Sequence, residues 1–208
     1  ESFSEWMRGK IVSVGQIQEA IPVLTESLPV KLGMEIVMAE IRMTADQRYI
    51  LAGSKKYEIA EMVLRQYPEG VEIYKRAKEL CEQANRFMPG LFDQERDFTS
   101  IFQRNEFADI AYLWGRGTYI HHSFVNEDVA LIQEIADKAA ELLETRSPIS
   151  VGRLFQMYQE RLVQGNIPNE YALYSMLRKH GSDRLAPHKF PHIWHKEDAF
   201  QLNNAELI

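Results

Sequence analysis

The sequence predicts a mainly α-helical fold with small β-hairpins, of the α+β class, in which similar units follow one another along the chain. Two observations lead to this prediction. Amphipathic helical stretches are followed by short hairpin-like segments, and two of these segments share the same spacing of leucine, glycine and tyrosine. We therefore expect three consecutive units of helices followed by a hairpin.

The composition is that of a globular chain without a membrane span. Of the 208 residues, 45% are hydrophobic and 11% aromatic, and no apolar run reaches the length of about eighteen residues that a membrane helix needs. The N-terminus lacks the features of a signal peptide, and Cys81 is the only cysteine. We therefore expect a cytoplasmic protein. Because it opens with Glu1 and not with methionine, we expect it to be part of a longer protein.

Three segments are predicted to form β-hairpins. The clearest spans residues 108–122, where two aromatic and β-branched runs flank a glycine-rich turn. The segment 47–59 repeats its spacing, and the segment 183–195 has prolines that restrict its strands to short or edge positions. The matching positions are Leu51, Gly53 and Tyr57 in one segment and Leu113, Gly115 and Tyr119 in the other.

Helical patterns precede each hairpin. In the last unit, one apolar face runs from Asp128 to Glu144, a second over residues 154–163, and a third over residues 172–177 before Gly181 ends it. Serine stands at a predicted N-cap in two places, in Ser13-Val14-Gly15 and in Ser150-Val151-Gly152. This second match also indicates a repeat.

The other two units are predicted to follow the same order. In the middle unit we expect helices over residues 59–67, 71–87 and 94–104, and in the first over 13–27 and 32–43, with an opening helix that is absent or lies in residues 1–10. The predicted organisation is a partial unit at 1–60, complete units at 61–125 and 126–200, and a tail at 201–208.

Three helices followed by a two-stranded wing resemble the winged-helix domains, and residues 171–194 are similar to those found with the delta subunit of bacterial RNA polymerase and to related HARE-type helix-turn-helix modules. The resemblance covers the architecture of most of the chain and rests on no diagnostic motif. It implies a binding function, since such domains include DNA readers, RNA binders and adaptors that contact only protein.

Charge is unevenly distributed along the chain. The formal net charge is −6, which argues against a protein that coats nucleic acid indiscriminately. Residues 146–196 nevertheless carry eight basic and three acidic side chains, or +5, so the remainder carries −11. The basic segment coincides with the last predicted unit.

If the resemblance holds, the third helix of the last unit enters a major groove and the wing contacts phosphate. The candidate side chains of that helix lie opposite its apolar stripe, and cations stand at all three predicted hairpin tips. The predicted nucleic-acid contacts are Tyr174, Ser175, Arg178, Lys179, Lys189, Arg116, Lys55 and Lys56. The alternative is a solvated helix end whose cations complement the helix dipole, and hairpin cations that serve solubility.

The sequence carries no motif for catalysis, a cofactor or a metal. The histidines His188, His192 and His195 fall in a hairpin interrupted by prolines, which is poor spacing for zinc. Cys81 is predicted to be a small buried residue and not a nucleophile. We therefore expect no enzyme, no cofactor and no metal site.

Two functions remain open from the sequence. The first is a DNA-binding or RNA-binding module, related to transcription or to genome defence, with most phosphate contacts in the last unit. The second is a protein–protein interaction scaffold of winged-helix units without direct contact to nucleic acid. A continuous positive stripe across the wings would favour the first, and an exposed apolar patch the second.

Overall fold

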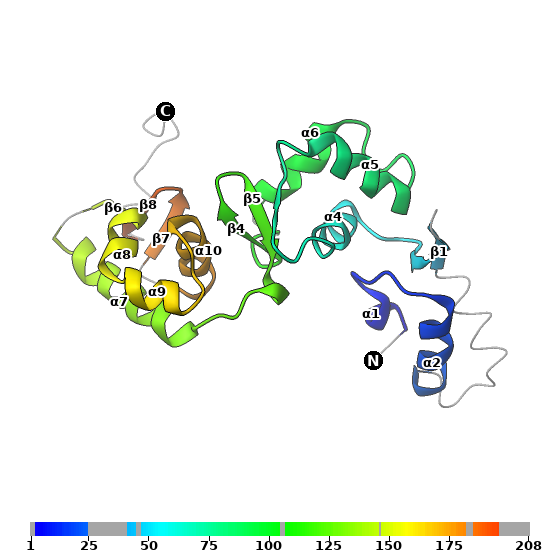
Figure 1. The fold of residues 1–208 in the computed structure, drawn as a ribbon, viewed down its shortest axis with the longest axis horizontal. Coiled ribbons are helices and arrows are strands. Elements are labelled where there is room, and N and C mark those ends of the chain that lie inside the picture. The colour runs from blue at the N-terminus through cyan, green and yellow to red at the C-terminus, as the bar shows by residue number, and fades with distance from the viewer. Residues whose placement is uncertain are drawn as a thin grey trace. The chain divides into compact units, whose positions relative to one another are not determined.

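The structure is a computed structural model with helices and small antiparallel sheets, an α+β fold as predicted (Figure 1). By their contacts the residues divide into two compact groups. The N-terminal group comprises residues 1–67 and 73–107, and the C-terminal group residues 68–72 and 108–208. The structure describes residues 3–24, 41–44, 47–104, 107–145, 147–181 and 185–195.

The N-terminal group begins with a helix, a single bridged residue and a second helix. Ser13 and Gln16 form a reciprocal cap, because each backbone N–H donates to the other's side chain, at 2.9 and 3.3 Å. The prediction of an N-cap at Ser13 is therefore confirmed. Val12 bridges Tyr49 of the following hairpin. The elements are α1 (Phe3–Met7), α2 (Val14–Leu24), β1 (Ile41–Met43) and β2 (Tyr49–Leu51).

The predicted hairpin over residues 47–59 is wrong. Its first half is β2, which pairs with the preceding β1, but its second half begins α4 (Lys56–Leu64). Glu58 starts the helix, because its carboxylate accepts the backbone N–H of Lys55 at 2.7 Å. Tyr57 thus lies in a helix, whereas Tyr119 lies in a strand, so the shared leucine, glycine and tyrosine spacing does not mark equivalent positions.

The rest of the N-terminal group packs around aromatic side chains. Its elements are α5 (Ala77–Phe87), α6 (Glu95–Thr99) and the 3-10 helix η1 (Ser100–Gln103). Successive ring centroids lie 4.9 to 5.5 Å apart in tilted or edge-to-face pairs, which is the favoured aromatic geometry. The rings belong to Phe92, Phe98, Phe102 and Phe107.

The C-terminal group contains the predicted hairpin at residues 108–122. It consists of β4 (Ala111–Gly115) and β5 (Thr118–His121), followed by the 3-10 helix η3 (His122–Phe124). Gly117 has a φ of 72°, which explains the need for glycine in this turn. A two-residue strand, β3 (Val71–Glu72), pairs with β5, so the sheet order is β3-β5-β4.

A second sheet and its helices complete the C-terminal group. The Asp128 side chain caps α7 by accepting the N–H of Leu131 at 3.0 Å. Ser150 holds the N-cap position of α8, but its hydroxyl makes no cap hydrogen bond. The elements are α7 (Val129–Leu143), β6 (Ile149–Ser150), α8 (Val151–Met157), α9 (Gln159–Gln164), α10 (Glu170–His180), β7 (Leu185–Lys189) and β8 (His192–His195), of which the last two are the predicted hairpin.

The same order of elements recurs along the described residues. A helix is followed by a short strand, further helices and a hairpin, and each time the short strand pairs with the last strand of its hairpin. The sheet orders are β3-β5-β4 and β6-β8-β7, and the bridge from Val12 to β2 repeats this order beside β1. Ser13 directly follows the bridged residue Val12, and Ser150 is the last residue of β6; each directly precedes a helix. Separate units at 1–60, 61–125 and 126–200 stay a prediction.

Candidate functional site

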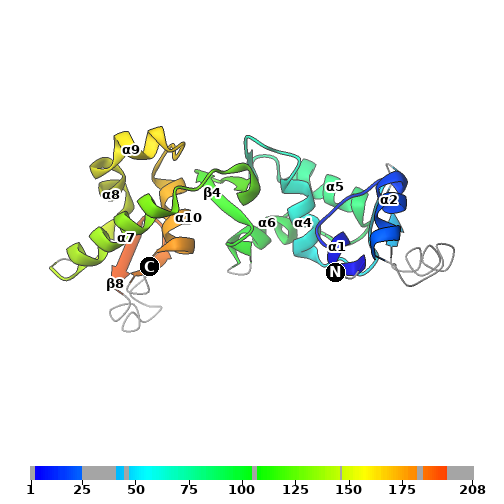
Figure 2. The ribbon, with the colours of Figure 1, turned by 90° about the horizontal axis from the view of Figure 1, so that it is seen from below.

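Within the C-terminal group, the polar side of α10 contacts β4. The Leu113 N–H donates to the Ser175 hydroxyl at 2.8 Å, and this hydroxyl lies 3.4 Å from the Leu113 carbonyl oxygen, to which it donates. The Asn169 side chain donates to the Trp114 carbonyl oxygen at 3.0 Å. Figures 1 and 2 both show α10 between β4 on one side and the helices α7 and α8 on the other. The contacts occupy the helix side that was predicted to face DNA.

A cluster of four polar side chains lies at the C-terminal end of this contact. The Lys179 ammonium donates to the Tyr112 hydroxyl at 2.6 Å and to the Glu127 carboxylate at 3.2 Å. The same carboxylate accepts hydrogen bonds from the Tyr112 hydroxyl and from His180 Nε2. Because the Glu127 side chain is only 14% exposed, its carboxylate depends on these three donors for most of its solvation.

The cluster shifts the pKa values of its members. Burial, followed by the adjacent Glu127 carboxylate, raises the pKa of the Tyr112 hydroxyl, which therefore stays protonated. Desolvation acts to raise the pKa of Glu127, but hydrogen bonds from Tyr112, His180 and Lys179 outweigh it and the pKa lies below its ordinary value. The carboxylate is therefore ionised at neutral pH and holds the hairpin strand β4 to the helix.

The expected exposure of the α10 side chains is corrected at three positions. Tyr174 is buried, since its ring packs edge-on against Phe190 and its hydroxyl donates to the Pro187 carbonyl oxygen at 3.1 Å. Ser175 and Lys179 are bound to β4 and to Glu127 as described above. Arg178 is exposed, as predicted. The prediction placed these residues opposite the apolar stripe, but that side of α10 also packs against protein.

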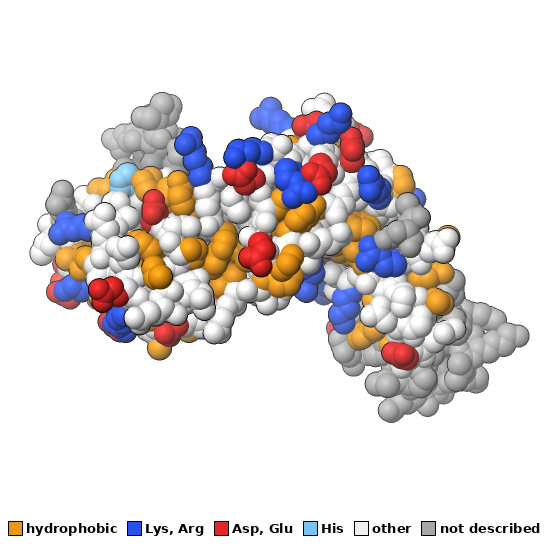
Figure 3. Space-filling view, viewed as in Figure 1, with side chains coloured by type: hydrophobic (Ala, Val, Ile, Leu, Met, Phe, Trp, Pro, Cys, Tyr) orange, Lys and Arg blue, Asp and Glu red, His pale blue; other side chains and the backbone are white. Residues whose placement is uncertain are grey.

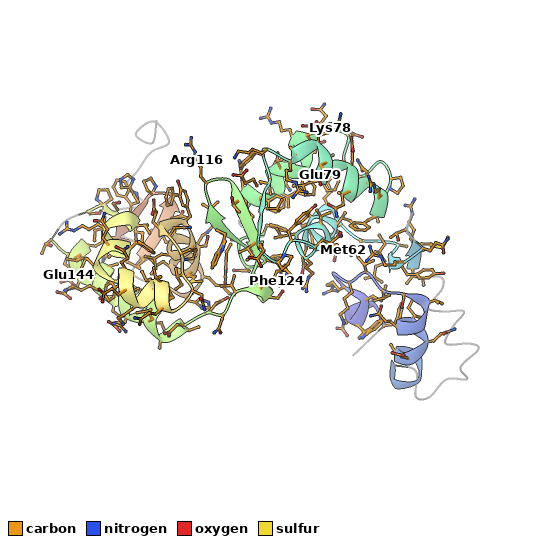
Figure 4. The ribbon with its side chains drawn as sticks, viewed as in Figure 1. Met62, Lys78, Glu79, Arg116, Phe124 and Glu144 are labelled. Atoms are coloured by element: carbon orange, nitrogen blue, oxygen red, sulfur yellow. The ribbon has the colours of Figure 1, made fainter. Side chains whose placement is uncertain are left out.

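The remaining predicted contacts lie in three different places. Arg116 is exposed in the β4–β5 turn, and Figure 4 shows its side chain extending away from the ribbon. Lys55 and Lys56 are exposed, but at the start of α4 and not at a hairpin tip. Lys189 ends β7, and its side chain lies outside the described residues. Basic and acidic side chains are interspersed over the described surface that Figure 3 shows.

Two hollows in the N-terminal group share Tyr57 as a lining residue. The first, of about 280 Å³, also has Lys56, Arg104, Asp97, Ser100, Ile101 and Phe107 in its walls. The second, of about 540 Å³, includes Arg8, Lys55 and Glu58. Tyr57 is 40% exposed, and the Lys55 ammonium lies 5.8 Å from the centre of its ring. Each hollow therefore combines an aromatic wall with two cations.

Groups that could support catalysis or metal binding are sparse. Among the described residues, no set of three histidine, cysteine or acidic side chains is placed to hold a metal ion. Cys81 is buried as predicted, and desolvation, followed by nearby acidic side chains, raises the pKa of its thiol. A nucleophilic cysteine needs the opposite shift. None of the helices in the described segments is long and apolar enough to cross a membrane.

Sequence reasoning missed Tyr112, Glu127 and Asn169, which join the hairpin to α10. Asn169 had a recognisable signal, since it directly precedes the helix and caps it by accepting the N–H groups of Tyr171 and Ala172. Its second role, toward Trp114, depends on a contact 55 residues away in the chain.

Comparison with family models, curated proteins and solved structures finds no match to this chain.

Proposed function

We propose that this chain is a non-catalytic interaction module of tandem winged-helix type, and that its last unit is a protein scaffold and not a DNA reader through α10. The recurring order of helix, short strand, helices and hairpin supports the winged-helix assignment. The two wings would be β4–β5 and β7–β8. In this arrangement α10 occupies the position of a recognition helix.

The observation that carries the scaffold proposal is the use of the polar side of α10 by β4 and Glu127. To contact bases, Ser175 and Lys179 would have to leave the Leu113 backbone and the Glu127 carboxylate. Each buried group left without a partner costs about 1–3 kcal/mol, which is as much as a good base contact contributes, about 1–3 kcal/mol. DNA contact by these side chains would therefore bring little net affinity.

Exposed apolar side chains of the C-terminal group also fit a protein partner. Phe124, in the 3-10 helix η3, is 42% exposed. Met157 and Val163, on the neighbouring helices α8 and α9, are 47% and 53% exposed. A protein surface can bury such groups, whereas a phosphate backbone gains little from them.

Fluorescence anisotropy with a random-sequence DNA duplex tests this proposal. We expect weak binding at low salt that disappears at moderate salt, and the same behaviour for Arg178→Glu on α10 and for its control Arg153→Glu on α8, another exposed arginine. Duplex binding that survives moderate salt and is lost in Arg178→Glu but not in Arg153→Glu would contradict the scaffold proposal.

Nucleic-acid binding through a wing is the second candidate, and the exposure of Arg116 in the β4–β5 turn favours it. A cation at this position can contact phosphate without disturbing α10. The same anisotropy measurement on Arg116→Glu separates the two candidates. Loss of duplex affinity in this variant alone supports the wing, and unchanged weak binding supports the scaffold.

A further inference from the structure

We call the two hollows beside Tyr57 together the Tyr57 cleft, and the smaller of them has an apolar floor. Ile101 and Phe107 line the smaller hollow and are 3% and 1% exposed, so they belong to the core of the N-terminal group. Its volume of about 280 Å³ is at the lower limit of small-ligand pockets, which begin at about 300 Å³. This size suits one large apolar side chain.

Each hollow is lined by two cations and one carboxylate, so positive charge is in excess. Lys56 and Arg104 line the smaller hollow, and Arg8 and Lys55 the larger one. All four are exposed, and none has a salt bridge within the described part of the chain. Glu58, in the larger hollow, is buried and accepts the Lys55 backbone N–H. The cleft is thus a cationic site on a chain of net charge −6.

We propose that the Tyr57 cleft binds an acidic peptide segment of a partner protein, with one large apolar side chain in the smaller hollow and carboxylates on Lys56, Arg104 and the cations of the larger hollow. This inference rests on the proposed function as a protein-interaction module and names the chemistry of one partner. Binding of this kind depends on a buried anchor and on complementary charge.

The arrangement of charges in the cleft favours a peptide over nucleic acid. Asp97 lines the smaller hollow together with Lys56 and Arg104. Its carboxylate can accept a hydrogen bond from a peptide N–H or hydroxyl, while the acidic side chains of the peptide face the two cations. Nucleic acid also requires cations that follow the phosphates along a strand, whereas here the cations border two separate hollows.

Selection from a random peptide library displayed on phage, with the full chain as bait, tests the proposal. Peptides that also bind the Lys56→Glu/Arg104→Glu double variant are removed, and the enriched peptides are labelled for fluorescence anisotropy. The matched control is Lys78→Glu/Arg86→Glu, which makes the same charge change at two exposed positions of α5 outside the cleft. Figure 4 shows Lys78 on the outer side of this helix.

We expect enriched peptides with several acidic residues around a phenylalanine, tryptophan, leucine or isoleucine. Their affinity should fall roughly tenfold or more in Lys56→Glu/Arg104→Glu and stay unchanged in the control. It should also weaken with rising salt. A photo-reactive group in place of the apolar side chain should cross-link to residues that line the smaller hollow, which mass spectrometry can locate without any variant.

Three results would overturn the inference. The first is that no peptide is enriched, or that the enriched peptides lack acidic residues. The second is that the cross-links lie outside the cleft. The third is that the chain binds a single-stranded oligothymidine but no peptide, and that Lys56→Glu/Arg104→Glu abolishes this binding. None of these three results contradicts the proposed function, provided that α10 does not bind duplex DNA. Conversely, salt-resistant duplex binding that depends on Arg178 contradicts the proposed function whatever the peptides do.

Discussion

The first turn of α4 and the last turns of α10 both carry cations that the sequence predicts to bind nucleic acid, but these cations differ in their exposure and in their contacts. On α10, Lys179 is 25% exposed and bound to Tyr112 and Glu127. On α4, Lys55 and Lys56 are exposed and face hollows without a salt bridge. This difference shows that a basic segment of sequence can form a binding surface only where its charged side chains are not already paired with other residues of the same fold.

The largest expected effect is on the α10 side of this comparison. Glu127→Gln removes the charge that Lys179 and His180 face, and we expect the free energy of unfolding to fall by about 2–3 kcal/mol, since a partly buried ion pair loses one partner. Urea denaturation followed by circular dichroism measures this change. The control is Glu134→Gln, whose salt bridge with Arg161 is exposed and should contribute less than about 1 kcal/mol. Equal effects in both variants would contradict the role of Glu127.

The Glu127 carboxylate should also make the stability of the protein depend on pH. Because the folded pKa of Glu127 lies below its unfolded value of about 4.3, its contribution is complete above that value and is lost as the pH falls through the folded pKa. We expect the difference in urea midpoint between the wild type and Glu127→Gln to shrink as the pH is lowered from about 7 to about 3. A difference that stays constant over this range would show that charge is not the cause.

A smaller effect is expected for Ser175→Ala, which removes the hydroxyl that bonds both backbone groups of Leu113. The Leu113 N–H then lacks its acceptor, so unfolding should become easier by about 1–2 kcal/mol. Ser150→Ala is the matched control, because this serine is exposed and its hydroxyl makes no cap hydrogen bond. The same denaturation measurement should show a change in Ser150→Ala of less than about 0.5 kcal/mol.

The smallest effect is expected on the α4 side. Lys56→Ala should change the free energy of unfolding by less than about 0.5 kcal/mol, because Lys56 is exposed and its described contact is with the Phe92 ring at 5.4 Å. Thermal or urea unfolding checks this value. A loss comparable to that of Glu127→Gln would mean that Lys56 supports the fold, and the contrast between the two helices would fail.

Local sequence signals predicted much of the fold. The hairpin at β4–β5 followed from the glycines beside Arg116, and α7 from its apolar face. The strands β3 and β6 were missed, because two residues are too few to show an alternating pattern and they form only by pairing with β5 and β8. The start of α4 was missed because its cap begins at Lys55, where serine, threonine, asparagine or aspartate is usual.

The candidate site was less predictable than the fold. Exposure of Arg178 and Arg116 could be read from helical position and turn type. The burial of Tyr174 depends on Phe190, and the pairing of Lys179 depends on Glu127, which precedes it by 52 residues. Such contacts arise when distant segments pack, and neither composition nor periodicity records them. Residues 146–196 therefore do carry an excess of positive charge, but this excess did not show which of the basic side chains are available to a ligand.

The contact between Ser175, Asn169 and β4 also protects the molecule from self-association. In the sheet order β3-β5-β4, β4 is an outer strand, and outer strands offer backbone groups to strands of other molecules. Here the side chains of Ser175 and Asn169 occupy the Leu113 N–H and the carbonyl oxygens of Leu113 and Trp114. The helix α10 thus covers this edge at Leu113 and Trp114, which leaves fewer backbone groups for a strand of another molecule to pair with.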